Sequence, residues 1–247
     1  MKRPGETVDP ILDGKLKIIQ KERGYRFSVD ALLLAHFVRP VKNGRLLELG
    51  AGSGVISLIL ARRWRCEGVV GVEIQGDLHE MALRNAALNG LADRVRMVRG
   101  DVRDIGRFLA AQSFDAVVFN PPYRKDRSGR VNPDDQKALA RHEIAGKIED
   151  FLKAAARALK TAGRVFTICP ASRTAELFDR MRTFRLEPKR VTVVYSHAAS
   201  DGEFVLVEGR KGGREAVTFL PPLVIYGQGG EYSPAMREIF RDLAERA

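Results

Sequence analysis

Short runs of β-branched and apolar residues alternate along this 247-residue chain with longer segments of helical spacing. Several runs, such as VVGV, AVVF and VFTIC, are apolar almost without interruption, which is typical of strands buried on both faces of a mostly parallel sheet. The alternation predicts an α/β fold with helices on both faces of one sheet. The seven predicted strands are Arg45–Leu49, Gly68–Glu73, Val95–Arg99, Asp115–Asn120, Arg164–Cys169, Lys189–Tyr195 and Glu203–Glu208.

The connections between these strands predict the topology. We expect helices after Gly54, over about Asp77–Leu88, and over the apolar stripe Ile148–Leu159, the last stopping at Gly163. Only the short polar stretch 196–202 separates the last two strands, which favours an antiparallel hairpin over a crossover helix. We therefore expect a doubly wound, seven-stranded, mostly parallel sheet with an antiparallel terminal hairpin.

Composition narrows the classes of protein further. The chain has 42 Lys and Arg against 31 Asp and Glu, a net charge of +11, so we expect an anionic partner, nucleic acid first. Cys66 and Cys169 stand far apart, which excludes a disulfide scaffold or a zinc ribbon and indicates a reducing, cytoplasmic setting. The two cysteines stand in no metal-ligand spacing, so we expect no metal. No apolar run approaches the roughly 18 residues of a membrane span, so we expect no membrane partner. Residues 1–44 are interpreted as an N-terminal extension that packs on the ligand side of the main domain, 45–247.

Three glycines directly follow the first predicted strand: Gly50, Gly52 and Gly54, in LELGAGSG. Glycine permits a tight turn and the close approach of a ligand, and the helix that follows offers unpaired N–H groups to an anionic ligand. A dinucleotide fingerprint would require Gly or Ala at Val55, and no Lys-Ser/Thr pair completes a phosphate-binding P-loop. An NAD-dependent oxidoreductase is therefore disfavoured but stays an alternative.

Acidic residues stand at the ends of the next two predicted strands. Glu73 ends the second strand, where a carboxylate can bind two ribose hydroxyls, and Asp101 follows the third, where it can meet an adenine edge. Ligands of open α/β sheets bind beyond the carboxyl ends of the strands. The three features together predict a nucleoside-bearing cofactor.

The fourth predicted strand ends in Asn120-Pro121-Pro122-Tyr123. Two consecutive prolines stop the strand and hold a rigid turn that lacks two N–H donors. The Asn120 side-chain oxygen and the Pro121 carbonyl then serve as fixed acceptors beside the Tyr123 ring, an arrangement that suits a planar substrate with an NH₂ group. Such acceptors favour the pyramidal, nucleophilic form of the amine.

In this order, LELGAGSG, GVE, GD and NPPY resemble the class I S-adenosylmethionine (SAM) methyltransferases, in particular the branch that methylates adenine N6, guanine N2 or glutamine N5. The segments GYRFSVDALLLAHF, ARHE and PPLVIYGQGGEYSPAMREIF extend the resemblance to the tRNA(Val) adenine-N6 methyltransferase family, over nearly the whole chain. The resemblance implies a Rossmann-like fold, SAM as cofactor, S-adenosylhomocysteine as product, and tRNA as partner, with methylation of an adenine beside the anticodon of a valine tRNA.

The resemblance also implies the residues of the site. Asn120, Pro121, Pro122 and Tyr123 would hold the target amine, with the glycines along the methionine part of SAM. The residues expected at the cofactor are Phe27, Asp30, Glu48, Leu49, Gly50, Ala51, Gly52, Gly54, Glu73, Ile74, Asp101, Val102 and Asn120. The residues expected to bind RNA, just past the NPPY turn, are Arg124, Lys125, Arg127 and Arg130.

Other functions stay open. Enzymes that methylate glutamine usually carry a preceding helical recognition domain, for which 44 residues are too few, and those that methylate rRNA guanine often have a duplicated domain. A SAM- or RNA-binding protein without catalysis is disfavoured by the intact NPPY turn.

His142 and Glu143 are interpreted as structural, because an alkylated amine can lose its proton to water without a general base. The oligomeric state, monomer or weak dimer, is left open.

Overall fold

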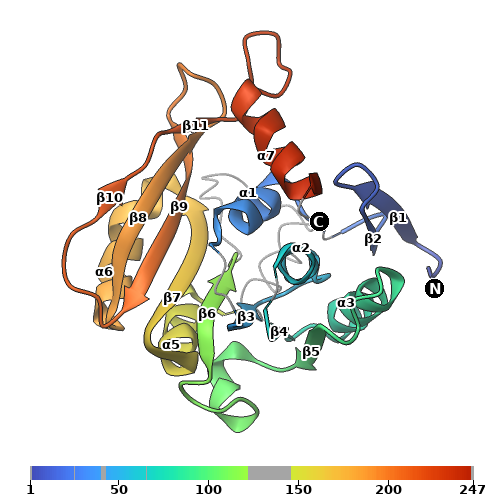
Figure 1. Ribbon diagram of the computed structural model, residues 1–247, viewed down its shortest axis with the longest axis horizontal. Helices are drawn as coiled ribbons and strands as arrows, with labels where there is room; N and C mark the ends of the chain where they lie inside the picture. Colours follow the sequence, from blue (N-terminus) through green and yellow to red (C-terminus); the bar gives the residue numbers. More distant parts are fainter. Residues whose placement is uncertain (1, 25, 40–42, 65, 122–145, 246–247) are drawn as a thin grey trace, which may run out of the picture.

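The computed structural model describes residues 2–24, 26–39, 43–64, 66–121 and 146–245. These residues form one mixed sheet covered by helices, with a separate two-stranded hairpin (Figure 1). The strands are β1 (Glu6–Ile11), β2 (Leu16–Lys21), β3 (Arg45–Leu49), β4 (Gly68–Glu73), β5 (Val95–Arg99), β6 (Phe114–Phe119), β7 (Leu159–Pro170), β8 (Leu186–Tyr195), β9 (Gly202–Lys211), β10 (Thr218–Phe219) and β11 (Leu223–Val224). The α-helices are α1 (Val29–Phe37), α2 (Val55–Arg63), α3 (Gly76–Leu88), α5 (Ile148–Ala158), α6 (Thr174–Thr183) and α7 (Pro234–Glu245), and the 3₁₀ helices are η1 (Val102–Arg107) and η2 (Ala171–Arg173).

The large sheet has the strand order β10-β8-β9-β7-β6-β3-β4-β5, with β11 also pairing β8. Strands β3 to β7 pair in parallel, whereas β9 lies antiparallel between β7 and β8. The predicted parallel sheet with an antiparallel terminal hairpin is therefore confirmed. The predicted count of seven is too low for the described residues, because β10 and β11 extend this sheet to nine strands. Each has only two residues, too few to give an alternating pattern.

Helix α5 ends earlier than the sequence predicts, at Ala158 instead of near Gly163, and β7 begins at the next residue. The carbonyl groups of Arg157 and Ala158 accept hydrogen bonds from the backbone N–H groups of Gln112 and Ser113, at 3.0 and 2.9 Å. These donors precede β6 and satisfy two carbonyls that a helix end leaves free. The chain can therefore leave the helix here and pair with β6 across a register irregularity.

The sheet is buried between two helical layers. Alternate residues of β3 point to opposite faces, so Leu46 packs with α1, α2 and α7 while Leu47 packs with α5 and α6. Figure 1 shows these two groups of helices on opposite sides of the sheet. Helix α2 is covered on most sides, and its seven residues from Val55 to Ala61 are all buried. The predicted helices on both faces are confirmed.

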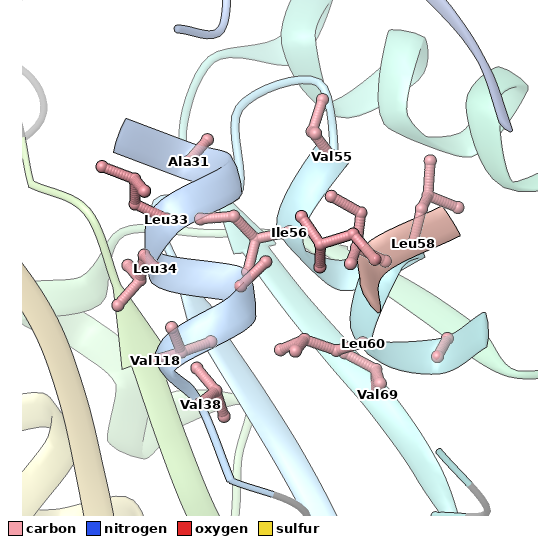
Figure 2. Close-up of a cluster of buried hydrophobic side chains, with 14 of the residues drawn as sticks. Ala31, Leu33, Leu34, Val38, Val55, Ile56, Leu58, Leu60, Val69 and Val118 are labelled. Atoms are coloured by element: carbon pink, nitrogen blue, oxygen red, sulfur yellow. The ribbon is translucent and has the colours of Figure 1, made fainter. Parts of the chain in front are cut away.

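Helix α1 is fixed to α2 and the sheet by apolar contacts. Its buried residues Ala31, Leu33 and Leu34 belong to the same cluster as Ile56 of α2 and Val118 of β6. Figure 2 shows these side chains gathered around α1, α2 and the neighbouring strands. Full burial of one such leucine stabilises the fold by roughly 1.5–3 kcal/mol, so α1 is a firm support for the residues in its first turn.

The hairpin β1–β2 lies beside α3 (Figure 1), and the sequence did not predict it. Asn85, a fully buried residue of α3, connects the two. Its side chain accepts from the backbone N–H of Ile19 at 2.7 Å and donates to the carbonyls of Ile19 and Ser53, at 3.0 and 2.9 Å. One side chain thus joins the hairpin to the glycine-rich turn.

Candidate active site

The carboxyl ends of four neighbouring strands lie at one edge of the sheet. Gly50 follows β3, Ile74 follows β4, Gly100 follows β5 and Asn120 follows β6. Because these strands pair in parallel, the residues that follow them emerge on the same side. The structure therefore brings the predicted glycine turn, the two acidic positions and the start of the NPPY turn to one edge.

The turn after β3 needs glycine. Gly50, Gly52 and Gly54 have φ angles of +69°, +57° and +85°, in the left-handed region that other residues rarely adopt. A Cβ atom at Gly50 would lie 3.1 Å from Cε1 of Phe151, and one at Gly54 would lie 3.1 Å from Cβ of Ala82. The turn is thus both strained for other residues and closely packed on its inner side.

Glu48 lies beneath this turn, with its side chain 2% exposed. Its carboxylate accepts a hydrogen bond from the backbone N–H of Ser57 at 2.8 Å and another from the Ser57 hydroxyl. Burial raises the pKa of this carboxyl from an ordinary 4.5 to about 8, and the nearby Glu73 charge acts in the same direction. The Glu48 side chain is directed at Ser57. Its predicted contact with a cofactor stays a prediction.

Glu73, at the end of β4, is 4% exposed and holds the turn from the other side. One carboxylate oxygen accepts from the backbone N–H of Gly52, and the other accepts from that of Gln75, both at 2.8 Å. Burial raises the pKa of this carboxyl. A buried pair of acceptors with lone pairs to spare, next to a turn with three glycines, is what a ribose diol requires. The residues present therefore fit a nucleoside cofactor.

Asp101 precedes η1, and its carboxylate is engaged with Arg103. The backbone N–H of Arg103 donates to it at 2.8 Å, and the guanidinium donates from Nη2 at 2.5 Å. These bonds lower the pKa of the Asp101 carboxyl. The sequence analysis does not place Arg103 at this edge, although an arginine two residues after the N-cap aspartate is the signal for such a pair. The predicted adenine contact of Asp101 stays a prediction.

Asn120 follows β6 and meets the N-terminal segment. Its Nδ2 donates to Oδ2 of Asp30 at 2.7 Å, across 90 positions of sequence. The other Asp30 oxygen accepts from the Ser28 hydroxyl. Pro121 is buried, and Phe119 packs on Phe151 with ring centroids 5.6 Å apart, so the start of the turn is anchored.

The remaining predicted residues divide into three groups. Leu49, Ala51 and Val102 are buried, so they can meet a ligand mainly through their backbone. Phe27 and Ile74 are half-buried. The predicted residues that lie outside the described part of the chain are Pro122, Tyr123, Arg124, Lys125, Arg127, Arg130, His142 and Glu143.

Among the described residues, no group of three or more His, Cys, Asp or Glu side chains could hold a metal ion. Cys169 is buried, and burial raises the pKa of its thiol to about 12, which makes it unreactive. In the same described ranges, every helix is too short or too polar to cross a membrane.

The methyltransferase small domain family matches residues 28–185. A relative from Porphyromonas gingivalis, named tRNA1(Val) (adenine(37)-N6)-methyltransferase, is 32% identical over 217 residues, which are 85% of this chain and 84% of the relative. The chain belongs to the methyltransferase small domain family. A relative of the same name from Aeromonas salmonicida is 27% identical over 84% of this chain and 85% of its own. The resemblance to the tRNA(Val) adenine-N6 methyltransferases stated from the sequence is thus confirmed.

Solved structures show the same fold as this methyltransferase. A predicted O-methyltransferase from Agrobacterium tumefaciens has a TM-score of 0.71 at 24% identity and covers 87% of this chain and 97% of its own. A geranyl diphosphate methyltransferase in complex with SAM has a TM-score of 0.53 at 18% identity, over 74% of this chain and 84% of its own. The predicted Rossmann-like fold is confirmed, and the protein is a SAM-dependent methyltransferase.

Proposed function

We propose that this methyltransferase modifies N6 of an adenine in tRNA, beside the anticodon of a valine tRNA. The observation that carries the proposal is the match over most of the chain to relatives named for that reaction. The chain retains Asn120-Pro121-Pro122-Tyr123 at the end of β6, a turn suited to a planar amine. The net charge of +11 supports a nucleic-acid substrate over a protein glutamine.

In this proposal the edge of the sheet holds SAM through its backbone and its acidic residues. Gly50, Gly52 and Gly54 leave room for the methionine part, Glu73 binds the ribose hydroxyls, and Asp101 binds the adenine amino group. The remaining cofactor contacts are assigned to the backbone near Leu49 and Ala51. SAM, when bound, supplies an electrophilic methyl group on a sulfonium.

Asn120 and Pro121 hold the target amine. The lone pair of an exocyclic amine is delocalised into its ring, so it is a poor nucleophile until the nitrogen becomes pyramidal. Two fixed acceptors, Oδ1 of Asn120 and the carbonyl of Pro121, take its two hydrogens and favour that form. The Tyr123 ring stacks on the flipped base. The proton lost from the alkylated nitrogen passes to water.

The RNA backbone follows the basic residues just past the NPPY turn, namely Arg124, Lys125, Arg127 and Arg130. In this proposal residues 1–44 are an extension on the cofactor side of a main domain, 45–247. The extension contributes Asp30 of α1, which contacts Asn120.

The test incubates the purified protein with labelled SAM and three acceptors: bulk tRNA, rRNA and a release-factor preparation. N6-methyladenosine recovered from tRNA supports the proposal, and sequencing of the labelled tRNA gives the position. Label in glutamine or in N2-methylguanosine overturns the substrate but retains the chemistry. Bound S-adenosylhomocysteine without label in any of the three acceptors points to an acceptor outside this set or to a binding protein.

A further inference from the structure

Asp30, in the first turn of α1, is bonded to the residue that the proposed function makes the acceptor for the target amine. We propose that Asp30 is a positioning residue: its carboxylate holds the Asn120 amide in the one orientation that leaves Oδ1 for the amine. This inference rests on the proposed function. It assigns to Asp30 a role toward Asn120 in place of the cofactor contact that the sequence predicts.

The contact is direct and short. Nδ2 of Asn120 lies 2.7 Å from Oδ2 of Asp30, and both residues are half-buried. Hydrogen bonds to an ionised acceptor of this length are about twice as strong as bonds between neutral groups. The bond joins the end of β6 to α1, two elements 90 positions apart, so it depends on the docking of α1 on the domain.

The chemistry of the two groups makes the bond selective. An asparagine amide has a donor end and an acceptor end of nearly the same shape, and a half-turn exchanges them. An ionised carboxylate only accepts, so Asp30 selects the orientation with Nδ2 toward itself. Oδ1 is then directed away from Asp30. Without that selection, the amide could present NH₂ to the target NH₂, which would repel it.

Asp30 is itself held in place. Its Oδ1 accepts a hydrogen bond from the hydroxyl of Ser28, which stands at the N-cap position of α1 but makes no capping bond there. The next residue, Ala31, is buried, as are Leu33 and Leu34 (Figure 2). Val118, two residues before Asn120, belongs to the same buried cluster. Both ends of the bond therefore rest on one packed core.

The charge of Asp30 favours the reaction as well as the orientation. A bond from Nδ2 to an anion polarises the amide and increases the electron density on Oδ1, which becomes a better acceptor. The target nitrogen gains positive charge when it is alkylated, and a fixed negative group nearby stabilises that charge. Neutral replacement of Asp30 should thus reduce the rate constant while substrate affinity stays the same.

The test uses the full-length protein with Asp30→Asn and Asp30→Ala. The asparagine of the first variant has the shape of aspartate, but it can donate as well as accept, so it no longer selects the orientation of Asn120. We expect kcat to fall by about 10- to 100-fold in both variants, with KM for the acceptor and Kd for S-adenosylhomocysteine within about twofold of wild type. The matched control is Asp13→Asn, which removes the same charge from an exposed turn.

A second readout does not depend on turnover. In ¹⁵N–¹H spectra the side-chain NH₂ signal of Asn120, assigned by its loss in Asn120→Ala, should shift in Asp30→Ala and stay in place in Asp13→Asn. An unchanged signal, or an unchanged kcat, overturns the inference. A loss of S-adenosylhomocysteine affinity equal to the loss of kcat overturns it in favour of a cofactor role. If wild type labels an acceptor other than tRNA, the proposed function fails, and the same variants are then measured on that acceptor.

Discussion

The carboxylate of Glu48, on β3, accepts hydrogen bonds from both the backbone N–H and the hydroxyl of Ser57, the third residue of α2. Helix α2 begins after Gly54, which has no side chain to cap the free N–H groups of the first turn. A residue of the preceding strand therefore caps the helix. The bond fixes both ends of the glycine-rich turn, so the turn keeps its shape without a ligand.

This arrangement predicts a pH-dependent stability. Because the Glu48 pKa is about 8 in the folded protein against 4.5 when exposed, the folded state binds the proton more tightly. The contribution of the protonated Glu48 carboxyl to the free energy of unfolding is therefore complete below pH 4.5 and is lost as the pH rises toward 8. In wild type the free energy of unfolding should fall by roughly 3–5 kcal/mol from this group between about pH 5 and 9, and Glu48→Gln should lack that fall. Urea unfolding across this pH range measures both proteins. Parallel pH profiles for the two proteins would contradict the prediction.

Gly50→Ala should weaken both stability and cofactor binding. The variant places a Cβ at a φ of +69° and 3.1 Å from the Phe151 ring. Gly90→Ala is the matched control, because its φ is +66° but nothing lies within 4 Å. Each should lose about 1–2 kcal/mol of stability from the backbone strain, and Gly50→Ala more because of the contact. Calorimetry should show lost S-adenosylhomocysteine binding in Gly50→Ala alone. An equal loss of affinity in Gly50→Ala and Gly90→Ala would exclude a role for the turn in binding.

Glu73→Ala should lower the affinity for S-adenosylhomocysteine by at least about 100-fold, because two hydrogen bonds to a carboxylate are removed. The control is Glu67→Ala, an exposed carboxylate just before β4. Isothermal titration of both variants checks the prediction. If both variants bind as wild type does, the ribose assignment is wrong.

Asn120→Ala should reduce kcat by at least about 100-fold and leave S-adenosylhomocysteine binding within about twofold of wild type. The reason is that the amide acts on the target amine and not on the cofactor. Single-turnover kinetics and calorimetry measure the two quantities separately. Equal loss of both would show that Asn120 supports the cofactor site instead.

Arg124→Ala and Lys125→Ala should each weaken tRNA binding and reduce the slope of log K against log salt by about 0.7–0.9. Each replacement removes one contact to a phosphate, so binding of the variant releases one counterion fewer from the RNA. The control is Arg182→Ala, since that guanidinium is paired with Glu187 at 3.1 Å. Filter binding between about 50 and 200 mM salt measures the slopes. An unchanged slope in both variants would move the RNA path elsewhere.

The sequence alone determined the features that depend on neighbouring residues, namely the strands and the glycine-rich turn. Apolar runs marked β3 to β9, and the glycines marked the turn after β3, because backbone conformation at those positions depends on the residues themselves. Glu73, Asp101 and Asn120 could be assigned to one edge, since parallel strands end on the same side of a sheet. The order of the motifs gives the resemblance to the SAM-dependent methyltransferases, and the positive net charge indicates an anionic partner.

Only the tertiary structure decided which groups meet. The early end of α5 depends on donors from Gln112 and Ser113, the capping of α2 depends on Glu48, and the orientation of Asn120 depends on Asp30. Each of these bonds joins segments that local propensity treats separately. A hydrogen bond between distant residues forms because packing brings its partners within about 3 Å, and that packing depends on the whole core.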